Sequence, residues 1–225
     1  MLRVIQNDPQ VPPGLVMDVL HERRTSYRLI QLFSGECLDS LEGIRGVIVL
    51  GGTMSVRDIA EFPFLQQLKR QIKEVVRKHI PFLGICLGGQ LLAEVLGGRV
   101  DRQKHGELGC HHVALTDQGQ HDPIFAGAPK HFISFQWHHD SFEPPPGTVH
   151  LASSDRCPYQ AFRFGKTAYG TQFHPEVTRE IVQAWSKDLG AESREFLHVF
   201  TEKEAEYRSA SLTILRNFFG VAGVL

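Results

Sequence analysis

The stretch Pro81-Phe82-Leu83-Gly84-Ile85-Cys86-Leu87-Gly88-Gly89-Gln90 decides the fold. It opens with a short apolar strand, predicted over Ile80–Leu83, and it leads into a helix predicted from about Gly89 to Leu96. Between the two stands Gly-x-Cys-x-Gly, the pattern of a nucleophile elbow with cysteine as the nucleophile. The first expectation is therefore an α/β sheet in which one strand turns tightly into a helix.

The elbow pattern suits Cys86 for chemistry. Glycines two positions to either side let the backbone pass without Cβ clashes. The N-terminus of the following helix favours an anion, and hence the thiolate. The competing interpretation is a small buried hydrophobe at a glycine-rich strand end. The strand before Cys86 and the helix after it favour the nucleophile.

Strand and helix patterns alternate over the first two-fifths of the chain. The apolar run Val47–Leu50 ends at Gly51-Gly52, as is typical of a buried parallel strand. Shorter strands follow Gly97-Gly98, two of them around a Gly165-Lys166 turn. The predicted fold class is α/β with three layers: a mostly parallel central sheet with helices on both faces, a smaller antiparallel sheet and a helical C-terminal tail.

The length of 225 residues fits one domain over residues 1–225, with a core over about 1–180 and a helical tail over about 181–225. Apolar residues make up 42% of the chain, which is enough for a sizeable core. In the tail, Thr201 and Glu204 are predicted to form a capping box ahead of a helix that Gly220 ends.

Composition excludes several classes of function. The 24 Lys and Arg residues balance 25 Asp and Glu residues, so no basic face for nucleic acid is expected. Apolar runs such as Gly46–Leu50 are too short to span a bilayer, so no membrane partner is predicted. The four cysteines form no C-x-x-C pair and the first residues do not resemble a signal peptide, which predicts a reduced, cytoplasmic protein.

No metal or cofactor is predicted. Twelve histidines include the pairs His111-His112 and His138-His139, but neighbours in a strand point to opposite faces and rarely bind one ion. No Gly-Lys-Ser/Thr follows Gly51-Gly52, which argues against a phosphate-binding loop there.

Three separated motifs carry a family resemblance: Gly51-Gly52-Thr53-Met54-Ser55-Val56, Gly84-Ile85-Cys86-Leu87-Gly88-Gly89-Gln90 and Gly170-Thr171-Gln172-Phe173-His174-Pro175-Glu176. In this order, over about residues 43–178, the sequence resembles the class I (triad) glutamine amidotransferases. It is most similar to stand-alone proteins that resemble the glutaminase domain of GMP synthase. No Ser-Gly-Gly-x-Asp-Ser pyrophosphatase loop of the synthetase half occurs in it.

The resemblance implies a catalytic triad. Cys86 would attack the glutamine side-chain amide, His174 would move the proton, and Glu176 would orient the imidazole. The residues support this separately, because His174 and Glu176 stand two apart at a strand end and can project from one face. The backbone N–H groups of Gly52 and Leu87 would bind the oxyanion.

The resemblance also implies a substrate pocket. Gln90 matches the family glutamine that contacts the α-amino acid end of the substrate. The segment Trp137, His138, His139 and Asp140 falls where the family lines the pocket. Trp137 and His139 are bulkier than the family residues at those positions, which leaves the choice of substrate open.

Four functions remain in consideration. The first is a glutaminase that hydrolyses glutamine and passes ammonia to a partner synthase subunit. The second is a stand-alone γ-glutamyl hydrolase or peptidase that acts on γ-glutamyl amides or conjugates. The third is a non-catalytic regulatory relative, which the intact Cys86, His174 and Glu176 disfavour. The fourth is a DJ-1/PfpI-type hydrolase, which Leu87 disfavours because histidine usually occupies that position.

Overall fold

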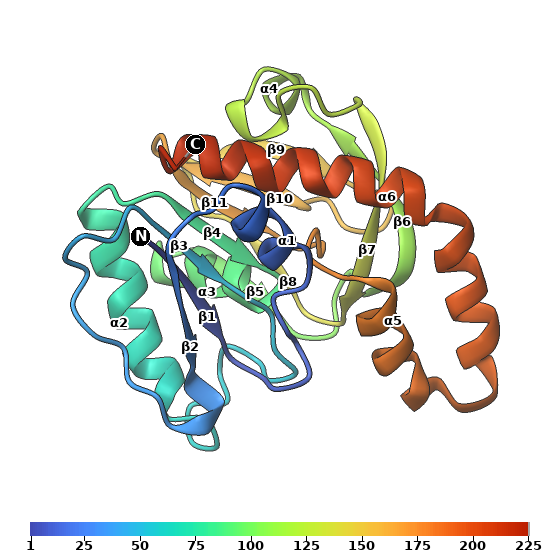
Figure 1. Ribbon diagram of the computed structural model, residues 1–225, viewed down its shortest axis with the longest axis horizontal. Coiled ribbons are helices and arrows are strands. Elements are labelled where there is room, and N and C mark those ends of the chain that lie inside the picture. Colours follow the sequence, from blue (N-terminus) through green and yellow to red (C-terminus); the bar gives the residue numbers. More distant parts are fainter. Residues whose placement is uncertain (225) are drawn as a thin grey trace.

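The computed structural model describes residues 1–224. Its centre is a nine-stranded sheet of order β2-β1-β3-β4-β11-β10-β9-β6-β7 (Figure 1). The strands β2, β1, β3, β4 and β11 pair in parallel, and the others continue the same sheet in antiparallel pairing. The bounds are β1 Leu2–Gln6, β2 Tyr27–Gln31, β3 Gly46–Val49, β4 Phe82–Ile85, β6 Glu107–Leu115, β7 His131–His138, β9 Val149–Ser153, β10 Ala161–Phe164 and β11 Ala168–Thr171. A separate antiparallel pair joins β5 (Arg99–Asp101) to β8 (Ser141–Glu143).

Helices cover both faces of the sheet (Figure 1). Helices α1 (Leu15–Glu22) and α6 (Ser193–Val221) share a core with Val4, Ile48 and Leu83. Helices α2 (Phe64–Arg77) and α3 (Leu87–Val95) pack on the opposite face, in a core with strand residues such as Val49 and Phe82. The two cores exist because successive side chains of a strand point to opposite faces. Helices α4 (Asp117–Gln120) and α5 (Arg179–Ser186) lie at the antiparallel end.

The predicted fold class is confirmed, with two local corrections. Strand β4 covers Phe82–Ile85 and helix α3 starts at Leu87, so both elements close in on Cys86 more tightly than predicted. The capping box at Thr201 and Glu204 was wrong. Helix α6 already begins at Ser193, and the Thr201 hydroxyl donates to the carbonyl of Leu197 inside it.

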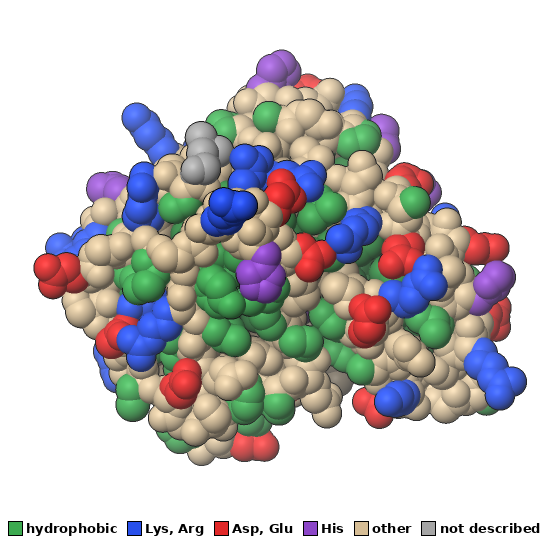
Figure 2. Space-filling view, viewed as in Figure 1, with side chains coloured by type: hydrophobic (Ala, Val, Ile, Leu, Met, Phe, Trp, Pro, Cys, Tyr) green, Lys and Arg blue, Asp and Glu red, His purple; other side chains and the backbone are tan. Residues whose placement is uncertain are grey.

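Helix α6 is held to the domain by apolar burial and by ion pairs. On the inner face of the helix, its own residues Leu215, Phe218 and Phe219 are fully buried. On its outer side Arg208 pairs with Asp18 at 2.8 Å, and Arg216 pairs with Glu22 of α1 at 2.7 Å. Figure 2 shows the resulting mixture of acidic and basic side chains over this face. Over residues 1–224, no helix combines the length and the apolar character needed to cross a bilayer.

The sharp turn after β4 depends on glycine. A Cβ added to Gly84 would lie 2.3 Å from the carbonyl oxygen of Gly88, closer than packed atoms can approach. We expect Gly84→Ala to lower the free energy of unfolding by about 3 kcal/mol, because the elbow backbone must shift. Gly127→Ala, where there is space around the residue and only a positive φ of 77° opposes a side chain, should cost about 1 kcal/mol. Denaturant unfolding measures both, and equal losses would contradict the steric explanation.

Candidate active site

Cys86 sits on the turn between β4 and α3 in a strained conformation. Its φ of 50° and ψ of −106° are unfavourable for a residue with a side chain. Two backbone bonds hold the turn: Cys86 N donates to Thr171 O at 2.8 Å, and Gln90 N donates to Cys86 O at 2.9 Å. The helix behind the turn packs closely, since a Cβ on Gly88 would lie 2.2 Å from Val49 O. The thiol is therefore fixed at the carboxyl edge of the sheet.

His174 and Glu176 follow β11, the strand beside β4. The backbone N–H of His174 donates to Phe135 O of β7 at 2.8 Å, and its Nδ1 lies 2.6 Å from Glu176 Oε1. Both side chains are buried. The Tyr207 hydroxyl of α6 donates to the carbonyls of His174 and Val177, at 3.0 and 3.1 Å. The carboxylate of Glu176 thus orients the imidazole ring directly, and Tyr207 of α6 fixes the backbone that carries it.

The structure brings Cys86 and His174 together at Gly51. A Cβ built on Gly51 would lie 3.1 Å from His174 Cε1 and 3.6 Å from the Cβ of Cys86. Both residues line one cavity of about 420 Å³. His174 Nε2 is buried and has no hydrogen-bond partner in the described part of the chain. The side of the ring away from Glu176 therefore faces Cys86 and the cavity.

The charges in the site favour the imidazolium form of His174. Burial by itself lowers the pKa of His174, but the neighbouring charges of Glu176 and Cys86 outweigh it and raise the pKa to about 10. The ring is then protonated at neutral pH when the thiol is ionised. This arrangement supports an ion pair between thiolate and imidazolium.

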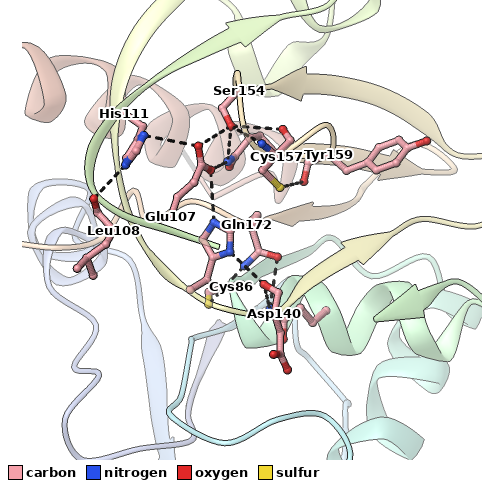
Figure 3. A network of polar contacts seen from close by, with 12 residues as sticks. Cys86, Glu107, Leu108, His111, Asp140, Ser154, Cys157, Tyr159 and Gln172 are labelled. Carbon is pink, nitrogen blue, oxygen red and sulfur yellow. Dashed lines mark hydrogen bonds and ion pairs between the residues drawn. The ribbon is translucent and has the colours of Figure 1, made fainter. Parts of the chain in front are cut away.

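A second amide contacts the thiol. Gln172 is fully buried, and its Nε2 donates to Cys86 Sγ at 3.6 Å, a normal distance for a bond to sulfur. Its Oε1 accepts from Gln90 Nε2 at 3.3 Å, and Gln90 Nε2 also donates to Asp140 O at 3.2 Å. Figure 3 shows this network running on towards Glu107. The role of Gln172 was missed from the sequence, although it stands in the third motif, two residues before His174.

The other predicted site residues lie around the same cavity. Gly52, Gln90, Trp137, His138, His139 and Asp140 all line it. Leu87 is buried behind it at the start of α3, and a Cβ on Gly52 would lie 2.9 Å from the Leu87 side chain. The predicted oxyanion residues are therefore neighbours. His138 and Gln90 are both buried and share one partner, because His138 Nδ1 lies 3.0 Å from Asp140 O and Gln90 Nε2 donates to the same oxygen.

The ring of His138 points towards a buried carboxylate. Its Nε2 lies 3.5 Å from Glu107 Oε2, and the ligand atoms of Glu107, His138 and Cys157 fall within 4.8 Å of one another, close enough to suggest a metal site. The carboxylate already accepts bonds from Ser154 and Gln160 (Figure 3). Burial raises the pKa of Cys157 to about 12. The hydrogen bonds that Glu107 accepts make the cluster a support for the end of β7.

Aromatic side chains form the wall beside His174. The Trp185 ring of α5 meets the His174 ring edge-on, with 5.3 Å between the ring centroids. The ring centroid of Trp137 lies 5.6 Å from that of Trp185. Trp185 Nε1 donates to Gln10 O at 2.6 Å, which ties α5 to the loop after β1. Both tryptophans are half-buried and line the cavity. Trp185 was not predicted, because an amphipathic pattern does not say which site its helix packs against.

Known proteins resemble this chain in sequence and in fold. Residues 16–183 match the family model described as glutamine amidotransferase class-I. The chain is 38% identical over 134 residues to the GMP synthase [glutamine-hydrolyzing] of Thermosipho melanesiensis, covering 59% of this chain and 24% of that protein. It is 37% identical over 142 residues to one of the subunits of the GMP synthase of Methanopyrus kandleri, covering 62% of this chain and 70% of that protein.

The chain spans about a quarter of the length of the Thermosipho relative. The likeness to a solved structure extends further. A glutamine amidotransferase from Thermotoga maritima superposes with a TM-score of 0.86 at 30% identity, over 96% of each chain. Because the family model covers well over half of the residues, the chain belongs to the class I glutamine amidotransferases.

Proposed function

We propose that this chain hydrolyses the side-chain amide of glutamine through a Cys86–His174–Glu176 triad and a γ-glutamyl thioester. The observation that carries the proposal is the buried His174 ring. It binds Glu176 at 2.6 Å on one side and meets the elbow Cys86 on the other. A nucleophile, a base and an orienting carboxylate in this order are the parts needed for acyl transfer.

The proposed reaction has two steps. Cys86 Sγ adds to the γ-carbonyl, the C–N bond breaks, and the proton on His174 Nε2 goes to the leaving amine. Water then adds to the thioester as His174 takes its proton, the C–S bond breaks, and glutamate leaves. The N–H groups of Gly52 and Leu87 would stabilise the oxyanion in both steps, where a single donor contributes about 3 kcal/mol.

Gln172 adds a donor to the thiolate in this scheme. We expect Gln172→Met, which keeps the volume but removes the amide, to lower kcat/KM about 10- to 100-fold, the usual worth of a bond to a charged group. Alkylation of Cys86 should also be slower in the variant, because the thiolate loses a hydrogen bond. The measurement belongs in a Cys37→Ser background, since Cys37 is exposed. Gln183→Met on the exposed side of α5 is the control, and an unchanged alkylation rate for Gln172→Met would remove Gln172 from the scheme.

The partner is part of the proposal. By likeness to the GMP synthase of Methanopyrus kandleri, whose matching part is a separate polypeptide, ammonia released at Cys86 would pass to a partner synthase. The second candidate is a stand-alone hydrolase of γ-glutamyl amides, and the half-buried tryptophans beside His174 favour it.

The test is direct detection of the intermediate. Purified protein is mixed with glutamine, quenched in acid and digested. The mass of the peptide that contains Cys86 is then measured by mass spectrometry. A γ-glutamyl adduct on that peptide, formed as fast as glutamate appears, supports the scheme. Glutamate release with no adduct at any time would contradict it.

A further inference from the structure

Two groups of contacts line the cavity. In the polar group, Gln90 binds Asp140 O, and Asp140 Oδ1 accepts from Gln103 N at 3.1 Å. In the aromatic group, Trp185 binds Gln10 O and packs on Trp137. Cys86 and His174 line the same cavity. A polar group and an aromatic group suit different parts of a substrate.

The position of His174 indicates where the leaving group of the substrate lies in the cavity. The ring must protonate the leaving nitrogen, so the leaving group lies against it. The side chain that packs on this ring is Trp185, at 5.3 Å, with Trp137 next to it. Ammonia as a leaving group has no apolar surface that could pack against the two indoles. An amine with a substituent on the leaving nitrogen could place that substituent along the indole rings. A cavity of about 420 Å³ also falls in the range that encloses ligands much larger than glutamine.

The charged side chains of the cavity favour a cation near the aromatic group. Asp188, three residues after Trp185 in the chain, is exposed and lines the same cavity as the two tryptophans. Within residues 1–224, Arg102 is the one Arg or Lys that lines the cavity, and it lies 3.9 Å from Asp58. Indole faces and a carboxylate together attract a positive charge on the leaving group and disfavour a carboxylate there.

We propose that Trp137, Trp185 and Asp188 form a leaving-group subsite, and that the preferred substrates are γ-glutamyl amides of amines that carry an apolar chain and a positive charge. This inference rests on the triad chemistry proposed above and replaces ammonia with a substituted amine. Atoms balance as before: the C–N bond of the amide breaks, His174 supplies the proton, and the free amine leaves before water opens the thioester.

The experiment compares kcat/KM for four substrates: glutamine, a γ-glutamyl diamine, γ-glutamyl anilide and γ-glutamylglycine. The diamine amide should exceed glutamine by at least about tenfold, and γ-glutamylglycine should be the poorest of the substituted amides. Trp185→Ala should remove most of the preference for the diamine amide over glutamine, while Trp185→Phe keeps the aromatic face and most of the preference. Both variants lose the bond to Gln10, so they form a matched pair.

A second pair isolates the charge. Asp188→Asn should lower the ratio of diamine amide to anilide, and Asp155→Asn, on an exposed loop away from the cavity, should leave it unchanged. Ratios are the readout, and for Trp185 the ratio compares the diamine amide with glutamine, because both release strongly basic amines and a disturbed His174 lowers their turnover similarly. A diamine preference that survives Trp185→Ala, or glutamine turned over as well as any amide, overturns the subsite and leaves the triad intact. No turnover of any of the four, or equal turnover after Cys86→Ala, overturns the triad itself.

Discussion

Cys86→Ala is expected to abolish turnover of every γ-glutamyl amide, a loss of about a millionfold, while the protein stays folded. The proposed chemistry has one nucleophile, and the other thiols cannot replace it. Burial raises the pKa of Cys110 to about 11 and that of Cys157 to about 12, and Cys37 lies on the exposed surface outside the cavity. The measurement is single-turnover release of glutamate with enzyme in excess over substrate.

The strained backbone at Cys86 supplies the control. Alanine at position 86 must still adopt a φ of 50°, whereas glycine adopts it without strain. Cys86→Gly should therefore be more stable than Cys86→Ala by about 1 kcal/mol and be equally inactive. Equal stability of the two variants would mean that the turn is not strained. Activity retained in either one would exclude Cys86 as the nucleophile.

Glu176→Gln is expected to lower kcat about 10⁴-fold with little change in KM. The carboxylate receives the Nδ1–H of His174 at 2.6 Å and so fixes Nε2 towards the thiol. An amide in its place can offer an N–H to Nδ1 and select the wrong tautomer. It also removes one of the two charges that raise the pKa of His174. Glu206→Gln, an exposed change on α6, is the control, and a wild-type rate in Glu176→Gln would remove the carboxylate from the mechanism.

The same variant has a signature in stability. A pKa raised to about 10 from an ordinary value of 6.5 means that the folded protein binds a proton that the unfolded chain has released. The resulting stabilisation is complete below pH 6.5 and is lost as the pH rises towards 10. Wild type should therefore lose more unfolding free energy than Glu176→Gln over this interval. Parallel pH profiles would show that Glu176 does not hold the proton on His174.

The parts of the site that could be predicted from sequence are those fixed by local backbone rules. An apolar strand, a Gly-x-Cys-x-Gly turn and a helix determine one another over ten residues, and His174 and Glu176 share a face because they are two apart. These rules and the family resemblance were enough to predict that Cys86 and His174 line one cavity and that Glu176 contacts His174.

The parts that could not be predicted come from packing between distant segments. Trp185 reaches His174 because α5 folds back over the sheet edge, and Glu107 meets His138 through the pairing of β6 with β7. Periodicity identifies such elements but not their neighbours. The error at Thr201 has a similar cause. A hydroxyl inside a helix can bind the carbonyl four residues earlier, and the local sequence resembles a cap either way.

The hydrogen bonds from Tyr207 to the carbonyls of His174 and Val177 have a consequence for the order in which the site is completed during protein synthesis. A growing chain displays its thiol elbow more than eighty residues before its imidazole and more than a hundred before the phenol that steadies it, as the positions 86, 174 and 207 show. Before α6 docks, His174 lacks the support of Tyr207 on its carbonyl. On the proposed mechanism, the chain would therefore become able to cleave γ-glutamyl bonds only after the last long helix has closed over the sheet.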